Sequence, residues 1–430
     1  MNLTAVWQGA ISRVIRQRAT IARFGWSLLP TLGALVVQLV TFVITARGLG
    51  PVQFGQYNVI LALAGIAVEL TGLGGADVLV RAVARNAGTF AHYFGNMLWL
   101  IVASVVPVTL ACLVYILNFD AIAVAGGVIA CGLFSEIIMA RISASCELIL
   151  VAHKHTIAAG WFRLGGMGAR CAAALVFFYG AGGEHLFSWV WMISAQSLIT
   201  CCIMLGLITS RYGRPVWSLI RGEFKSGLGF CLTQSSRAAQ SNLDRVVLSH
   251  FADAATLGVY SATSRMMQLG LFPIQVATRM TYPQFFAEGA AGLASVRRFA
   301  LRVAPVFFAI GLVAGVMVAV ATWLLPLVLG SAFGGTARIG LFLAFTLPLI
   351  ALQYPAADAL TGGGRQSVRA VIQIIATIGF GFIMAFGAAL YGQTGLVAAM
   401  IACQLLLAAA LWGSLFVAEG GRPNATPSVE

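Results

Sequence analysis

The chain has 430 residues, of which 60% are hydrophobic and only 9% are charged. A soluble domain carries about 25% charged residues, so this composition cannot supply a polar surface and excludes a soluble enzyme or binding module. The formal net charge is +13. The basic residues lie mostly between apolar stretches, which is typical of the loops of a membrane protein and argues against nucleic-acid binding.

The first segment of the chain is a basic arm, residues 1–23. It contains Arg13, Arg16, Arg18 and Arg23 and no acidic residue. The apolar run that follows is long enough to span a membrane and has no convincing cleavage site. We therefore expect a first transmembrane helix rather than a cleaved signal peptide, with the arm held in the cytoplasm.

Twelve apolar segments follow one another along the chain, and each is long enough to cross a hydrocarbon core of about 30 Å. They predict an all-α polytopic membrane protein with about 12 transmembrane helices. Basic residues gather in alternate connections, which predicts that both termini are cytoplasmic. The expected segments are 24–46, 57–80, 93–117, 121–150, 156–180, 185–208, 227–250, 258–286, 299–328, 337–360, 367–390 and 394–417.

The longest connection, 209–226, is basic and divides the helices six and six. We expect an N-lobe at 24–208, this cytoplasmic inter-lobe linker, a C-lobe at 227–417 and a cytoplasmic tail at 418–430. The halves share a short motif, because Phe54-Gly55-x-Tyr57 superposes on Leu257-Gly258-x-Tyr260 after a shift of 203 residues. Parallel repeats of this kind are typical of transporters, with the substrate path at their interface.

Charged side chains inside apolar helices carry the chemistry, because a charge facing lipid costs about 2.5–3.5 kcal/mol even on lenient scales. Polar residues recur every three or four positions in segments 227–250 and 258–286, and Arg163 and Arg170 lie seven residues apart in 156–180, which places them on one face of each helix. Such stripes indicate either a cavity wall or interhelical hydrogen bonds. The cavity interpretation predicts these substrate-binding residues: Arg163, Arg170, Arg237, Arg265, Gln268, Gln275 and Arg279.

A cavity lined by arginine favours an anion, since guanidinium stays charged and binds phosphate with paired donors. A pyrophosphate-linked lipid is therefore the cargo we expect. A second set of charged residues is predicted to couple transport to ions or to gate it, and comprises Glu69, Asp77, Arg81, Glu136, Asp244 and Arg245. The alternatives are local: an ion pair between Asp77 and Arg81, four residues apart, and simple pairing of each buried acid with an arginine.

Enzyme signatures are missing from the sequence. It contains no Walker motif, no nucleophile elbow and no metal-ligand spacing. We therefore expect no catalytic residue, no metal and no cofactor. The connections expected outside the cytoplasm are about 3–10 residues long, too short for the extracytoplasmic region that a membrane polymerase or ligase needs.

Two stretches resemble a known family. Residues 45–85 (TARGLGPVQFGQYNVILALAGIAVELTGLGGADVLVRAVAR) and 242–266 (NLDRVVLSHFADAATLGVYSATSRM) are similar to the bacterial polysaccharide-biosynthesis flippases, also called Wzx or O-antigen flippases, of the multidrug/oligosaccharidyl-lipid/polysaccharide exporter superfamily. The resemblance implies a V-shaped, MATE-like pair of six-helix lobes around a cationic central cavity. It spans both halves, although the last four helices match only in pattern.

The function that the resemblance implies is movement of an undecaprenyl-pyrophosphate-linked oligosaccharide from the cytoplasmic to the periplasmic leaflet of the bacterial inner membrane. Alternating access, ion-gradient coupling and a polysaccharide polymerase or co-polymerase as partner belong to the same expectation, together with contacts to membrane lipids. The main alternative is a multidrug exporter of the same fold, which would favour an acidic or neutral cavity. A lipid II flippase would carry two more helices, and a major-facilitator sugar porter would carry a GxxxDR-like loop, where this chain reads VRAVARNAGTF.

Overall fold

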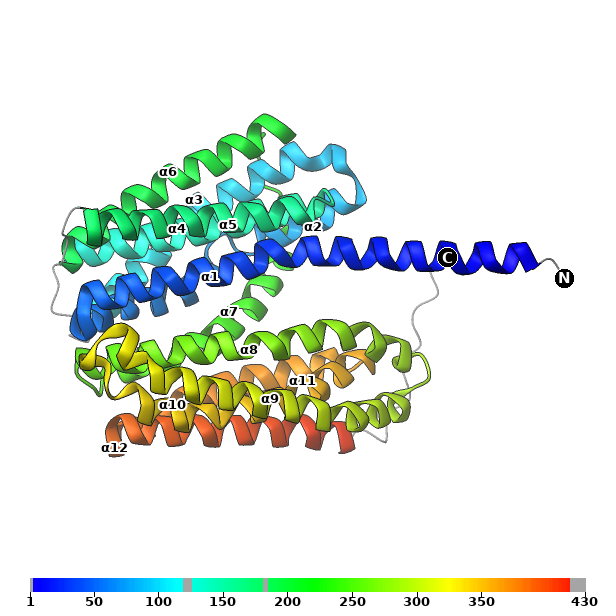
Figure 1. Cartoon of the computed structure of the whole chain (residues 1–430). Coiled ribbons are helices and arrows are strands. Elements are labelled where there is room, and N and C mark those ends of the chain that lie inside the picture. The colour runs from blue at the N-terminus through cyan, green and yellow to red at the C-terminus, as the bar shows by residue number, and fades with distance from the viewer. Residues whose placement is uncertain (1–2, 119–125, 181–184, 418–430) are drawn as a thin grey trace. The chain divides into compact units, whose positions relative to one another are not determined.

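The apolar segments form α-helices in the computed structural model, which describes residues 3–118, 126–180 and 185–417 (Figure 1). No strand occurs among these residues. Short 3-10 turns lie at Ala87–Thr89, Arg221–Glu223 and Ser331–Phe333, and a π-helical turn lies at Val176–Gly180. The α-helices are α1 (Leu3–Leu70), α2 (Gly75–Arg85), α3 (Phe90–Asn118), α4 (Gly126–Ala152), α5 (Thr156–Leu175), α6 (Leu186–Tyr212), α7 (Phe224–Leu248), α8 (Ala254–Gly289), α9 (Leu293–Leu329), α10 (Thr336–Ala344), α11 (Thr346–Gly362) and α12 (Gln366–Val417).

Two pairs of expected helices are joined by a kink rather than by a loop. Helix α1 contains both 24–46 and 57–80 up to Leu70, and it bends at Gly50, where φ is 66°. Helix α12 contains 367–390 and 394–417 and bends at Tyr391 and Gly392, where φ at Gly392 is 58°. Glycine adopts positive φ without a Cβ penalty, so each bend contains a glycine.

Two expected helices are instead interrupted, which corrects the sequence-based boundaries. Segment 57–80 breaks between Leu70 and Gly75, and its continuation, α2, runs on to Arg85. Gly72 and Gly74 have positive φ in this break, and Ser104 of α3 accepts a hydrogen bond from the Gly72 amide at 2.7 Å. Segment 337–360 is divided at Phe345 into α10 and α11. Periodicity alone detects neither break, because apolar residues continue through both.

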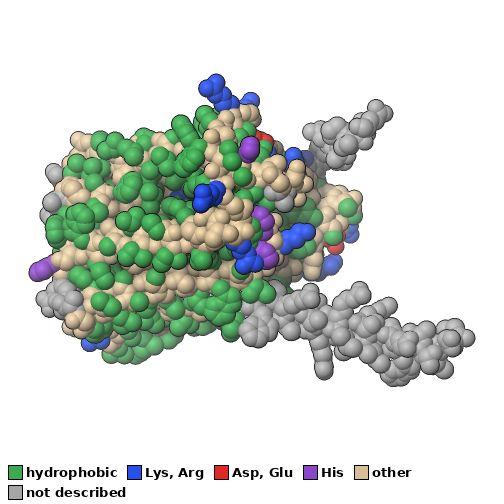
Figure 2. Space-filling view, turned by 90° about the horizontal axis from the view of Figure 1, so that it is seen from above, with side chains coloured by type: hydrophobic (Ala, Val, Ile, Leu, Met, Phe, Trp, Pro, Cys, Tyr) green, Lys and Arg blue, Asp and Glu red, His purple; other side chains and the backbone are tan. Residues whose placement is uncertain are grey.

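The surface of the protein is suited to lipid. Hydrophobic side chains cover most of the face seen in Figure 2, and many large ones on α9 and α12 are exposed. Seven stretches of the described chain are long and apolar enough to cross a membrane: Leu32–Leu70, Phe90–Asn118, Gly126–Ala152, Leu186–Tyr212, Leu293–Leu329, Ser331–Gly362 and Gln366–Val417. The chain is therefore a multi-pass membrane protein. The count of 12 crossings and the cytoplasmic placement of both termini stay predictions.

The described chain forms two compact units. Unit 1 contains residues 3–48, 67–113 and 126–231, and unit 2 contains 49–66, 114–118 and 232–417. In unit 1, α4 packs against α2, α5 and α6 around buried side chains that include Leu79, Phe94, Ile149, Cys201 and Met204. In unit 2, α9 packs against α8, α10 and α11, with Tyr260, Phe285, Phe307 and Phe333 fully buried. The lobe and linker boundaries expected from the sequence stay predictions, and the tail 418–430 lies outside the described residues.

Candidate functional site

The two arginines expected on segment 156–180 lie on α5 and are both paired with acids of α4. Arg170 binds Glu136 through two hydrogen bonds, of which Nη1 to Oε2 is 2.9 Å. Arg163 binds Glu147, with Nε 2.9 Å from Oε2. The sequence placed no acid on α5 itself, so an excess of positive charge there was expected. The neighbouring helix supplies the missing acids and corrects that expectation, while a substrate role for either arginine stays a prediction.

Two other predicted site residues of unit 1, Arg81 and Glu69, find partners that sequence spacing did not indicate. Arg81 binds Glu223 and donates to the Ser226 hydroxyl at 2.9 Å, so the expected local pair with Asp77 is not formed. Asp77 lies in the first turn of α2, where a carboxylate is favoured by the helix dipole. Glu69 lies 3.6 Å from the nearly buried guanidinium of Arg141. Glu69 and Glu136 therefore each pair with an arginine, as the simpler alternative proposed.

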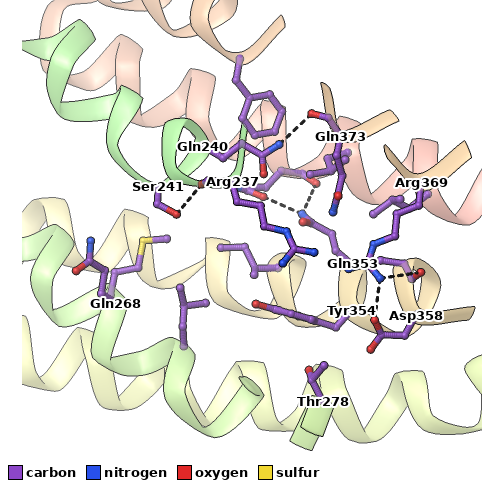
Figure 3. Close-up of a pocket in the computed structure, with 18 of the residues that line it drawn as sticks. Arg237, Gln240, Ser241, Gln268, Thr278, Gln353, Tyr354, Asp358, Arg369 and Gln373 are labelled. Atoms are coloured by element: carbon purple, nitrogen blue, oxygen red, sulfur yellow. Dashed lines mark hydrogen bonds and ion pairs between the residues drawn. The ribbon is translucent and has the colours of Figure 1, made fainter. Parts of the chain in front are cut away.

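Unit 2 contains a cavity of about 680 Å³ between α7, α8, α11 and α12 (Figure 3). Four of the predicted site residues line it, namely Arg237, Asp244, Gln268 and Arg279. Arg265 and Gln275 are not among its lining residues, and Arg265 instead donates to the Gln268 side chain at 3.2 Å. On α8 the cavity face runs through Ser264, Gln268, Leu271, Thr278 and Tyr282, so it is rotated slightly from the stripe that the sequence indicated.

The cavity combines positive charge with amides. Arg237 and Arg279 lie within ion-pairing distance of no acid that the structure describes, and Figure 3 shows Arg237 pointing from α7 toward α11. Amide side chains of Gln240, Gln268, Gln353, Gln373 and Gln404 complete much of the polar wall. Two guanidinium groups that form no ion pair with a described acid, next to amides, suit an anionic ligand that also carries hydroxyl groups.

Asp244 lies in the cavity wall and belongs to a buried hydrogen-bond network. Tyr260 donates its hydroxyl to Asp244 Oδ2 at 2.7 Å, and the Ser264 hydroxyl lies 3.3 Å from the same oxygen. Arg245 Nε lies 3.7 Å from Oδ1, and its Nη2 donates to the backbone oxygen of Ser241. These contacts bring together two of the residues predicted for ion coupling. Among the described residues, no three His, Cys, Asp or Glu side chains are grouped to hold a metal ion.

Sequence reasoning missed one pair in the cavity, Asp358 of α11 and Arg369 of α12. Arg369 Nη1 lies 3.1 Å from Asp358 Oδ1, and both residues line the cavity with Tyr354. Neither residue was among the site residues predicted from the sequence. A signal existed, because Tyr354, Asp358 and Thr361 recur every three or four positions in an otherwise apolar segment.

A protein-family model described as "Polysaccharide biosynthesis protein" matches residues 21–287, more than half of the chain. The chain belongs to the polysaccharide biosynthesis protein family. The match extends from α1 through α8 and therefore includes the α7 and α8 walls of the cavity. No curated protein matches the chain.

Solved structures of exporters and flippases have the same fold as this family member. An inward-facing multidrug resistance MATE family transporter of the MOP superfamily gives a TM-score of 0.73 at 17% identity, covering 89% of this chain and 94% of that one. The lipid II flippase MurJ, in an inward closed conformation, gives 0.68 at 11% identity, covering 91% and 87%. A Vibrio cholerae MATE transporter, VcmN, gives 0.60 at 16% identity, covering 91% and 94%. The fold is thus MATE-like, as the sequence predicted.

Proposed function

We propose that the protein is a flippase that moves an undecaprenyl-pyrophosphate-linked oligosaccharide from the cytoplasmic to the periplasmic leaflet of the bacterial inner membrane, for assembly of a surface polysaccharide. The observation that carries the proposal is the pair of arginines, Arg237 and Arg279, that line the cavity of unit 2 and form no ion pair with a described acid. Both side chains are exposed on the cavity wall, and charged residues of membrane-spanning helices normally face such a cavity or the substrate path. Membership of the polysaccharide biosynthesis family supports a glycan as the rest of the cargo.

Different side chains of the cavity suit different parts of such a substrate. Arginine forks bind pyrophosphate oxygens with two parallel donors, and glutamine amides both donate to and accept from sugar hydroxyls. The polyprenyl chain stays in the bilayer, because about 0.8 kcal/mol per methylene opposes its transfer to water. The transport cycle is alternating access through the cationic cavity, coupled to an ion gradient, and a polysaccharide polymerase or co-polymerase receives the product.

A multidrug exporter is the second candidate, favoured by the MATE-like fold and by two acids on the cavity wall, Asp244 and Asp358. A cationic drug would need these acids to outweigh the arginines. The lining contains three arginines and two aspartates, which sum to a formal charge of +1. Coulomb repulsion by this excess disfavours an organic cation.

The test is the fate of lipid-linked oligosaccharide in a deletion strain. We expect the intermediate to accumulate in the cytoplasmic leaflet, surface polymer to be lost, and the wild-type gene to restore both. Arg237→Ala or Arg279→Ala should restore less than about a tenth of the polymer, since each removes one charge-assisted contact worth about 1.5–3 kcal/mol. Arg265→Ala is also predicted to restore little polymer, because Arg265 donates a hydrogen bond to the cavity residue Gln268. Intact polymer with unchanged lipid intermediates in the deletion strain would reject the flippase and direct attention to drug susceptibility.

The matched control is Arg298→Ala. Arg298 is an exposed arginine near the start of α9 and does not line the cavity. It should restore polymer to the wild-type level at equal expression. Equal failure of Arg298→Ala and Arg279→Ala would show that the loss reflects the removal of any arginine rather than of a cavity charge.

A further inference from the structure

The connection between α6 and α7 is fixed to the start of α3, although most of it is not helical. The Val216 amide donates to the backbone oxygen of Ala91 at 2.9 Å, and the Ile220 amide donates to Asn96 Oδ1 at 2.9 Å. A Cβ added to Gly95 would lie 1.8 Å from the Val216 backbone oxygen, so the two backbones are in close contact. The connection is therefore an ordered part of the surface of unit 1.

This connection lies where two membrane-spanning helices end. Helices α3 and α6 are both long and apolar enough to cross a membrane, with 29 and 27 residues. At 1.5 Å per residue each is about 40 Å long, which exceeds the hydrocarbon core of about 30 Å and reaches the headgroups on both sides. The connection follows the last residue of α6, Tyr212, and contacts the first two turns of α3. These contacts place it at the level of the membrane–water interface.

Large apolar side chains of the connection are exposed. Trp217 is 61% exposed, and Val216, Leu219 and Phe224 are exposed beside it in the sequence. Tryptophan is enriched at membrane–water interfaces, because its ring is apolar and its indole N–H donates to headgroups or water. Exposed apolar groups on an ordered segment at this level are covered well by lipid and poorly by water.

Basic side chains surround these apolar groups. Glu223 is the one acid between Arg211 and Lys225 in the sequence, and it is paired with Arg81 of α2. The ring centroids of His153 and Tyr212 lie 4.1 Å apart, which brings the turn after α4 beside the end of α6. Five exposed bases of these two regions form what we call the basic surface: Lys154, Arg211, Arg214, Arg221 and Lys225. None of them forms an ion pair with an acid that the structure describes.

We propose that the basic surface binds the headgroups of anionic phospholipids in the leaflet that it faces, with Trp217 and Leu219 inserted between the lipids. A phosphodiester accepts the paired donors of an arginine, and each basic side chain near an anionic bilayer favours contact by about fivefold. A free phosphate ion would leave the apolar side chains between the bases in water, whereas a bilayer covers both. The role is independent of the cargo, since the cavity belongs to unit 2.

The test uses the full-length protein in phosphatidylcholine bilayers that contain a minor fraction of brominated lipid. Bromine in the upper part of the acyl chains quenches the fluorescence of tryptophan at the interface. The brominated lipid is either anionic phosphatidylglycerol or zwitterionic phosphatidylcholine. The difference in fluorescence between the wild type and Trp217→Phe isolates the signal of Trp217 from those of the other tryptophans among the nine in the chain.

We expect brominated phosphatidylglycerol to quench Trp217 at least about twofold more than brominated phosphatidylcholine at low salt, because the bases enrich anionic lipid around it. Sodium chloride at 1 M should remove this preference, since it shortens the Debye length to about 3 Å. Replacing two bases, in Arg214→Gln/Arg221→Gln, should at least halve the preference and leave quenching by phosphatidylcholine unchanged. Arg298→Gln is the matched control, because Arg298 is an exposed arginine of unit 2, and it should keep the wild-type preference.

Equal quenching of wild-type Trp217 by the two lipids at low salt, or a preference that salt leaves unchanged, would overturn the binding of anionic headgroups. Absence of quenching by either lipid would overturn the interfacial position of the connection. If the double variant is not recovered from membranes, the salt dependence of the wild type decides alone. Inorganic phosphate distinguishes the source of the anion. A loss of preference no greater than in sodium chloride of equal ionic strength supports bilayer lipid, and a much greater loss would show that free phosphate occupies the surface and would refute the lipid assignment.

Discussion

Arg170 is predicted to stabilise unit 1 through its pair with Glu136. It donates two hydrogen bonds to Glu136, whose side chain is 8% exposed, whereas that of Arg170 is 27% exposed. Arg170→Ala would leave a buried carboxylate without its counter-ion. Breaking a buried pair costs about 3–5 kcal/mol, and the partial exposure of Arg170 places the expected cost near the lower limit, about 3 kcal/mol.

A loss of this size is measurable as a thermal shift. For a unit of roughly 200 residues, about 3 kcal/mol lowers the unfolding midpoint by about 6–12 °C. The midpoint can be followed by the loss of the monodisperse size-exclusion peak of detergent-solubilised protein after heating. Adding Glu136→Gln to Arg170→Ala removes the orphaned charge and should recover at least half of the shift, because the double variant leaves no ion uncompensated.

Arg163→Ala is the matched comparison on the same helix. Arg163 also pairs with an acid of α4, but its side chain is 48% exposed, so its removal should cost less than about 1 kcal/mol. Our reasoning is refuted if Arg170→Ala keeps the wild-type midpoint and loses transport. That result would mean that Arg170 binds substrate and that Glu136 tolerates its absence.

Three further outcomes are expected. Gly258→Ala should lower the unfolding midpoint of unit 2, since an added Cβ would lie 2.0 Å from the Pro51 backbone oxygen and overpacking costs about 1–3 kcal/mol. Gly413→Ala places no atom within 4 Å of the added Cβ, so it should leave the midpoint unchanged or raise it. A lower midpoint for Gly413→Ala than for Gly258→Ala, measured by size exclusion after heating, would contradict this packing. Arg81→Ala should lower the unfolding midpoint by less than about 4 °C, because the Arg81 and Glu223 side chains are 34% and 29% exposed and such pairs contribute about 0–1 kcal/mol. A larger shift would show that this ion pair contributes more to the stability of unit 1 than an exposed pair does. Burial in the connection after α7 lowers the pKa of His250 below its ordinary value, so its neutral form stabilises the fold above about pH 6.5 and this contribution is lost as the pH falls. The midpoint should therefore fall more between pH 7.5 and 5.5 in the wild type than in His250→Gln, and identical pH profiles would rule out this role.

Several properties of the protein follow from the sequence without its tertiary structure. Membrane insertion follows from composition, because 9% charged residues cannot cover a soluble molecule of this size. Helical segments follow from the length of the apolar runs, and α7 follows from its stripe, since Arg237, Ser241 and Asp244 do share the cavity wall. The family follows from local motifs near Arg47 and Asp244, within the matched residues 21–287. These features depend on residues that are close in the chain, and periodicity reports them directly.

Tertiary structure decided which charges meet. Arg163 and Arg170 seemed to lack acids only because Glu147 and Glu136 belong to another helix, and Asp358 gained its importance only from Arg369, 11 residues away and across a turn. On α8, the cavity face passes through Gln268 and Arg279 but not Arg265 or Gln275. Sequence periodicity specifies the faces of one helix, but the rotation of that helix against its neighbours depends on packing between residues that are distant in the chain. The charge of a buried site is set by those neighbours, so it is decided only when the helices are assembled.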